Sequence, residues 1–185
     1  MLQALRELLI DELKDILHAE QQLINALPKL ANAAHNPKLK EAFAKHLAQT
    51  KGQVDRLNSA FELLGEKPEP KPCKAMMGLV QEGEETIQDG KDQEEVIADL
   101  ALIMAAQKVE HYEIASYGGV RCLARQIGQR EVETLLAHTL GEEESSDYLL
   151  TALAKPLLQQ ASEEDAPNSR KQSKQQSKTT AMTRG

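Results

Sequence analysis

Apolar residues recur at helical spacing along most of the 185-residue chain. Leu9, Leu13 and Ile16 follow one another at intervals of three or four residues, which places them on one face of a helix. Prolines and glycines interrupt this pattern at 35–37, 65–72, 89–92 and 127–129. The spacing therefore predicts helices over about 3–34, from the 35–37 turn to Gly65, and over about 73–88, 93–127 and 129–160.

The order of these helices indicates how they pack. Two long helices joined by a tight turn are followed by a long, proline-rich connection that carries the short helix, and then by two more long helices. We therefore expect an all-α four-helix bundle with a long crossover carrying a short fifth helix. Pro28 and Pro156 fall inside predicted helices, where they introduce either a kink or an early end.

The periodic pattern stops after Gln160. The remaining segment is rich in Ser, Gln and Lys and has no apolar face. We therefore predict one helical domain over 1–160 and a disordered polar tail over 161–185.

Composition and charge exclude several classes of protein. Aromatic residues make up 3% of the chain and Trp is absent. Residues with a high helix propensity make up most of the sequence instead. The net charge of −7 argues against nucleic acid as a partner of the folded part. The two cysteines, Cys73 and Cys122, form no metal-binding or disulfide pattern. No apolar run reaches the roughly 20 residues of a membrane span, so we expect a cytoplasmic protein with no membrane partner.

Acidic residues interrupt the apolar faces of the long helices. Glu20 lies seven residues after Leu13 and seven before Leu27, at the centre of the first apolar face. The remaining polar residues on such faces are Glu110 and Glu113 in 93–127, His46, Thr50 and Gln53 in the second helix, and either Glu143 or Glu144 together with Asp147 in the last. Because these positions lie at mid-helix, we expect them to converge inside the bundle.

The spacing of these positions repeats along the chain. Glu20 and Gln53 are 33 residues apart, and so are Glu110 and Glu143. A duplicated helical hairpin with an offset of about 90 residues explains this agreement.

Several carboxylates at one depth in a low-dielectric core require neutralisation, because each costs several kcal/mol to desolvate. Two divalent cations supply it, and an oxygen-rich ligand set suits iron or manganese. Protonation, or pairing with Arg56 or Lys108, is the metal-free alternative.

The segments "DELKDILHAEQQLINALPKL", "HLAQTKGQVDRL", "AMMGLVQEG" and "AAQKVEHYEIASYG" resemble the YciF-like family of bacterial stress proteins, a domain family of unknown function. The resemblance covers about 5–158. It implies a ferritin-like bundle, commonly a homodimer, with a dinuclear metal centre like that of rubrerythrin.

This resemblance also implies a ligand set. Glu20 matches the Glu of the first helix, and Glu110 and Glu113 match the ExxE motif of the third. The other positions that match ligands are Gln53 and Arg56 in place of Glu and His, and Glu144 and Asp147 in the last helix. Both usual histidines are therefore replaced. For His111 we expect a surface role or the support of a neighbouring ligand, rather than metal ligation.

Two functions follow from these expectations. The first is a redox centre of two iron or manganese ions held by Glu20, Gln53, Glu110, Glu113, Glu144 and Asp147, which consumes peroxide or oxygen or oxidises ferrous iron. The second is a non-catalytic structural or interaction protein of the stress response, in which any metal only stabilises the bundle. The lost histidines favour the second, and the retained carboxylates favour the first.

Overall fold

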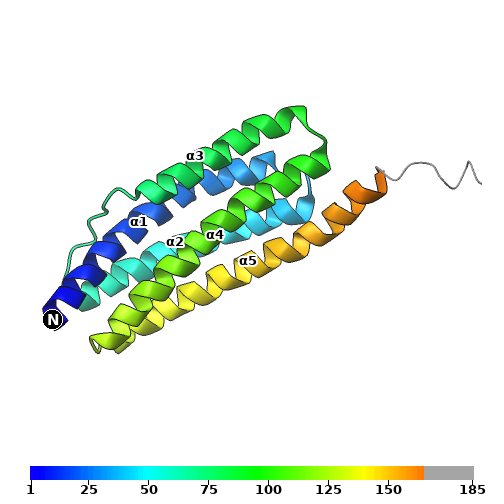
Figure 1. Cartoon of the computed structure of the whole chain (residues 1–185). Helices are drawn as coiled ribbons and strands as arrows, with labels where there is room; N and C mark the ends of the chain where they lie inside the picture. Colours follow the sequence, from blue (N-terminus) through cyan, green and yellow to red (C-terminus); the bar gives the residue numbers. More distant parts are fainter. Residues whose placement is uncertain (165–185) are drawn as a thin grey trace, which may run out of the picture.

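The computed structural model describes residues 1–164, and within them the chain is helical almost throughout (Figure 1). The elements are α1 (Leu2–Ala33), α2 (Pro37–Leu64), α3 (Lys74–Asp89), the 3-10 turn η1 (Gly90–Asp92), α4 (Glu95–Gln126) and α5 (Arg130–Glu164). The predicted all-α bundle with a crossover carrying a short fifth helix is confirmed.

The four long helices run lengthwise beside one another, and α3 covers one side of the bundle (Figure 1). Two hairpins, α1–α2 and α4–α5, form the most extensive packing. α1 also packs against α4 and α2 against α5, while α3 packs on α1 and α4. This arrangement brings polar residues of all four long helices to one level. No helix of the described segment is both long and apolar enough to span a membrane.

The turn between α1 and α2 is fixed from two sides. The Asn36 side chain accepts hydrogen bonds from the backbone N–H groups of Lys38 and Leu39, and Pro37 occupies the first turn of α2. The buried Asp99 carboxylate of α4 accepts the backbone N–H groups of His35 and Asn36 at 2.8 and 2.7 Å. The first hairpin is therefore attached directly to the second.

The crossover begins at Gly65, whose φ of 70° closes α2 in the left-handed conformation that glycine adopts without strain. It then lies along α1, where Lys71 N–H donates to the Lys14 carbonyl and Cys73 N–H donates to His18 Nδ1. The Cys73 thiol sulfur accepts the Met76 N–H and begins α3. These contacts hold α3 against the hairpins.

Neither internal proline ends its helix, because α1 continues past Pro28 and α5 continues past Pro156. α5 extends to Glu164, four residues beyond the predicted boundary at 160. The rest of the predicted tail lies outside the described residues.

Two apolar clusters form the core, one toward each end of the bundle. The first contains Leu23, Leu27, Phe43, Ile103 and Leu150 among its members. The second contains Leu13, Ile16, Leu57, Tyr117 and Leu136 among its members. On each long helix, at least one buried polar residue lies between the parts that belong to the two clusters.

Candidate metal centre

A layer of buried polar side chains separates the two apolar clusters. On α1, Glu20 lies between Leu17 of the second cluster and Leu23 of the first. The other members are His46, Thr50 and Gln53 on α2, Glu110 and Glu113 on α4, and Glu143 on α5, all at most 5% exposed. Every long helix therefore contributes at least one polar group to one enclosed layer.

Four of these side chains form a compact cluster. His46, Glu110, Glu113 and Glu143 each offer a ligand atom, and these atoms lie within 4.8 Å of one another. His46 Nε2 is 3.5 Å from Glu110 Oε1 and 3.6 Å from Glu143 Oε2. Three carboxylates and one imidazole from three helices thus converge on a volume that one or two ions would fill.

Glu20 lies beside this cluster, and the Tyr117 hydroxyl holds it there. The phenol donates a short hydrogen bond to Glu20 Oε1, and both side chains are fully buried. The charge of Glu20 raises the pKa of Glu113 more than that of either other carboxylate does, so the two groups are close. Glu20 therefore extends the oxygen-rich region on the α1 side.

Gln53 connects α2 to the acidic pair on α5. Its Nε2 donates to Glu143 Oε1 through a short hydrogen bond and to Glu142 Oε2 at 3.1 Å. Arg56, one turn further along α2, forms an ion pair with Glu142 and donates from Nε to Thr139 Oγ1 at 2.9 Å. Gln53 thereby orients the Glu143 carboxylate, while Arg56 is engaged by Glu142.

The cluster carboxyl groups favour the neutral form in the absence of a cation. Burial raises the pKa of Glu20, Glu110 and Glu113 well above its usual range, and the charges of neighbouring carboxylates raise it further. For Glu143 burial raises the pKa to about 7, although hydrogen bonds from neighbours and the charge of Arg56 oppose this rise. Ionising all of them at neutral pH therefore requires compensating positive charge.

His46 does not supply that charge. Burial lowers the pKa of its imidazole to about 4, so the ring is neutral at physiological pH. Its Nδ1 lies 3.1 Å from Ser146 Oγ on α5. When Nδ1 carries the proton and donates it to Ser146, Nε2 presents a lone pair to the cluster, which is the form that binds a metal.

The chemistry of the unpartnered atoms fits a divalent cation. Within residues 1–164, seven buried side-chain atoms have no hydrogen-bond partner: Glu20 Oε2, His46 Nε2, Gln53 Oε1, Glu110 Oε2, both oxygens of Glu113, and Glu143 Oε2. Buried polar atoms without partners are rare, because each costs about 1–3 kcal/mol. Six oxygens and one nitrogen gathered in one layer form a donor set that suits iron or manganese.

The structure brings together Glu20, Gln53, Glu110 and Glu113 of the predicted ligand set. The side chain of Glu144 is exposed, and the neighbouring Glu143 takes the inward position on α5.

The remaining predicted ligand, Asp147, lies outside the compact cluster. Asp147 Oδ1 accepts a hydrogen bond from Gln107 at 2.8 Å and is 3.4 Å from His111 Nε2. The His111 side chain is 68% exposed, in agreement with the surface role expected for it.

The metal-free pairings considered for the carboxylates do not form directly. Lys108 forms an ion pair with Glu82 on the surface. Arg56 pairs with Glu142, and only its longer-range charge lowers the pKa of Glu20 and Glu143. Protonation and metal binding are the two remaining ways to neutralise the cluster.

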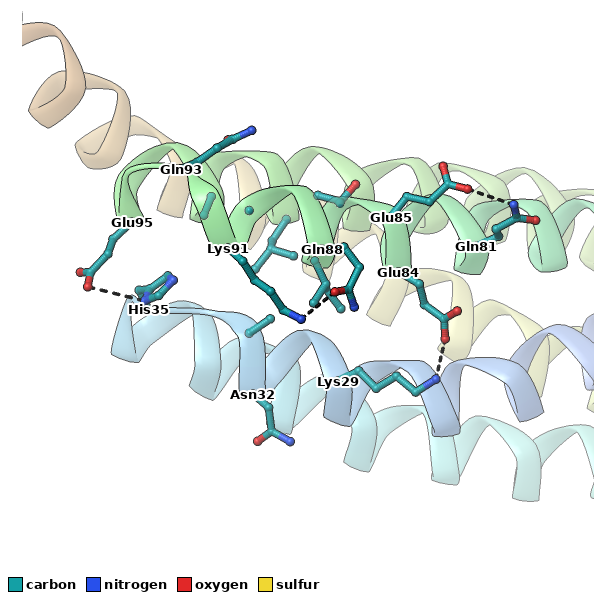
Figure 2. A pocket seen from close by; sticks show the side chains of 16 residues that line it. Lys29, Asn32, His35, Gln81, Glu84, Glu85, Gln88, Lys91, Gln93 and Glu95 are labelled. Carbon is teal, nitrogen blue, oxygen red and sulfur yellow. Dashed lines mark hydrogen bonds and ion pairs between the residues drawn. The ribbon is translucent and has the colours of Figure 1, made fainter.

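A large hollow of the described surface lies elsewhere, where α1, α3 and the start of α4 meet (Figure 2). It measures about 1140 Å³, and none of the buried carboxylates of the polar layer lines it. Its charged groups already have partners, such as Lys29 with Glu84 at 2.5 Å and His35 with Glu95 at 3.8 Å. The chemistry of the site therefore belongs to the enclosed layer and not to this hollow.

Comparisons with known proteins agree with this architecture. Residues 4–163 match the model of a domain of unknown function, DUF892. The chain is 45% identical to Protein YciF of Escherichia coli (strain K12) over 154 residues, which cover 83% of this chain and 92% of that protein.

Solved structures give the same result. The crystal structure of the E. coli stress protein YciF has a TM-score of 0.80 at 44% identity and covers 84% of this chain and 97% of its own. YcfI from Rhodopseudomonas palustris is described as a candidate structural protein. Its structure has a TM-score of 0.76 at 37% identity and covers 80% of this chain and 92% of its own. The chain belongs to the YciF-like family of DUF892 proteins.

Proposed function

We propose that this chain is a carboxylate metalloprotein of the YciF-like family that holds two iron or manganese ions and reacts with a small oxidant. The observation that carries the proposal is the convergence of seven unpartnered buried atoms between two apolar clusters. A core layer built only for stability would pair these atoms with one another or replace them with apolar side chains.

The proposed ligands are Glu20, His46, Glu110, Glu113 and Glu143. Gln53 positions Glu143 through its amide, and Tyr117 positions Glu20 through its hydroxyl. When His46 Nδ1 donates its proton to Ser146 Oγ, the His46 Nε2 lone pair faces the cluster. His46 thus supplies an imidazole from α2 seven residues before Gln53, although the histidine positions expected from the family resemblance hold Arg56 and Asp147.

Bound ions of this kind supply electrons to a small oxidant and stabilise the negative charge that develops on it. The apolar clusters keep bulk water from the ligands. In the metal-free protein, burial raises the pKa of the carboxyl groups and so favours their protonated form.

A second function is favoured by two observations. YcfI, a relative at 37% identity, is described as a candidate structural protein. The amide of Gln53 and the Arg56–Glu142 ion pair occupy the positions where the family resemblance leads one to expect ligands. In this alternative the ions only stabilise the bundle, and no oxidant is consumed.

Metal content measured after anaerobic reconstitution with Fe²⁺ or Mn²⁺ tests the proposal. We expect the wild-type protein to retain close to two ions per chain and the Glu110→Ala variant to retain fewer. Equal metal content in the two proteins would refute the metal centre. Retained metal without consumption of peroxide, oxygen or ferrous iron would establish the structural alternative.

A further inference from the structure

A small cavity reaches the candidate metal centre from the surface between α2 and α5. It measures about 40 Å³, and its lining includes Ala42 and His46 of α2, Glu110 of α4, and Ser146 and Leu149 of α5. His46 and Glu110 also belong to the compact cluster. The cavity therefore ends on two of the proposed ligands.

Burial increases from the outer to the inner end of this cavity. Leu149 is 38% exposed and Ala42 is half-buried, whereas His46 and Glu110 are 5% and 3% exposed. The imidazole lies between the cavity and the cluster, with Nδ1 3.1 Å from Ser146 Oγ and Nε2 3.5 Å from Glu110 Oε1. A molecule that enters between Ala42 and Leu149 thus arrives beside the ligands.

Several other directions of approach are filled by side chains. The two apolar clusters close the layer toward both ends of the bundle. Tyr117 fills the space beside Glu20 and is fully buried, and the Arg56–Glu142 ion pair covers Gln53. The cavity between α2 and α5 is a route that these contacts leave open.

We propose that this cavity binds the oxidant, and that the oxidant is a neutral molecule of two heavy atoms, hydrogen peroxide or dioxygen. This inference rests on the proposed metal centre. The cavity holds only a few water-sized molecules, because one water needs roughly 10–15 Å³ of such space. Organic substrates occupy pockets of about 300 Å³ or more and do not fit.

Loss of hydration disfavours anions for a separate reason. The exposed Lys45 lines the outer part of the cavity, but the apolar side chains of Phe43, Leu149 and Leu150 make up much of the lining beside His46 and Glu110. An anion at the inner end would lose its hydration against this lining, whereas a neutral oxidant would lose little. The Ser146 hydroxyl, which accepts from His46 Nδ1 in the proposed metal form, can donate its own proton to a peroxide.

Nitric oxide, a neutral molecule of two heavy atoms, is a suitable probe because its association with Fe²⁺ is measured by stopped-flow absorbance without turnover. Ala42→Leu narrows the cavity from α2, and Leu149→Phe narrows it from α5. Ala44→Leu and Leu158→Phe are matched controls on the same helices, since both positions are exposed and neither lines the cavity.

We expect each narrowing variant to slow nitric oxide association at least tenfold, while both controls keep the wild-type rate and all four variants keep wild-type Fe²⁺ content and thermal stability. Wild-type association rates in both narrowing variants that hold Fe²⁺ would overturn the entry route and leave the metal centre intact. A wild-type protein that holds no Fe²⁺ would overturn both proposals.

Selectivity provides a second measurement on the same proteins. The wild-type iron form should consume hydrogen peroxide and leave tert-butyl hydroperoxide unreacted, and Leu149→Ala should gain reaction with the larger peroxide. Equal wild-type rates with the two peroxides would overturn the size limit.

Discussion

His46 Nε2 lies 3.5 Å from Glu110 Oε1, which places the imidazole of α2 against the carboxylate of α4 in the centre of the bundle. Neither atom of this contact is on the surface, and His46 Nε2 has no hydrogen-bond partner. Because burial lowers the pKa of His46 to about 4, the contact is not an ion pair at neutral pH. It is the arrangement that we expect of two ligands of the proposed cation.

Replacing His46 should therefore weaken metal binding. We expect His46→Ala to lower the affinity for Mn²⁺ about tenfold or more, because the nitrogen ligand is lost. His111→Ala is the control, since that side chain is 68% exposed. Mn²⁺ titration followed by electron paramagnetic resonance measures both. Equal affinities in the two variants would remove His46 from the ligand set.

The adjacent residues Glu143 and Glu144 allow a matched comparison on α5. Glu143 is fully buried and accepts a hydrogen bond from Gln53, whereas Glu144 is exposed. We expect Glu143→Gln to reduce Mn²⁺ affinity about tenfold or more and Glu144→Gln to leave it unchanged. Loss of Mn²⁺ affinity in Glu144→Gln but not in Glu143→Gln would show that Glu144, and not Glu143, binds the metal.

The four buried carboxyls should make the stability of the metal-free protein fall as pH rises above 4.5, their ordinary pKa. The pKa of Glu20, Glu110, Glu113 and Glu143 is raised by folding, so the folded state holds more protons than the unfolded state and loses stability as they dissociate. Each such carboxyl contributes up to about 1.4 kcal/mol per pH unit.

His46 acts in the opposite direction, but only at lower pH. Folding lowers its pKa from 6.5 to about 4. Its contribution to the free energy of unfolding therefore grows as pH rises between these values and is complete above 6.5. The carboxyl effect is therefore clearest from pH 6.5 to 8.5. We expect the melting temperature of chelator-treated protein to decrease over this range, and saturating Mn²⁺ to remove the decrease. A metal-free melting temperature that rises over the range would contradict the carboxyl pKa directions.

The hydroxyl of Tyr117 should contribute to stability through Glu20. Tyr117→Phe leaves the buried Glu20 carboxyl without its donor, which costs about 1–3 kcal/mol in the free energy of unfolding. Tyr148→Phe removes a hydroxyl from a side chain that is 75% exposed and should change little. Urea unfolding of the metal-free variants gives both values, and a loss below 0.5 kcal/mol in Tyr117→Phe would contradict this assignment.

The helices and the depth of the polar layer follow from the sequence because both depend on periodicity. Glu20 lies seven residues from Leu13 and from Leu27, and a spacing of seven keeps a residue on the same helix face. The equal 33-residue separations of Glu20 from Gln53 and of Glu110 from Glu143 indicated that the two hairpins meet at one level. Gln53 and Glu143 do meet there.

Two features of the site could not be decided from spacing. Glu143 and Glu144 lie three and four residues after Leu140, and both intervals fit a helix of 3.6 residues per turn. His46 is seven residues before Gln53, which put it on the correct face. Its burial, however, depends on how closely α5 packs on α2 at Ser146. Such contacts between helices are not encoded in the periodicity of either helix alone.

The division of the core into two apolar clusters has a consequence for motion. Because the carboxylate layer lies between them, one half of the bundle can open without breaking the apolar contacts of the other. In the metal-free protein, backbone amides of the two halves should then exchange with solvent hydrogen as two separate cooperative units. Ions bound by residues of all four long helices would join these units, so that the whole bundle opens together or remains closed.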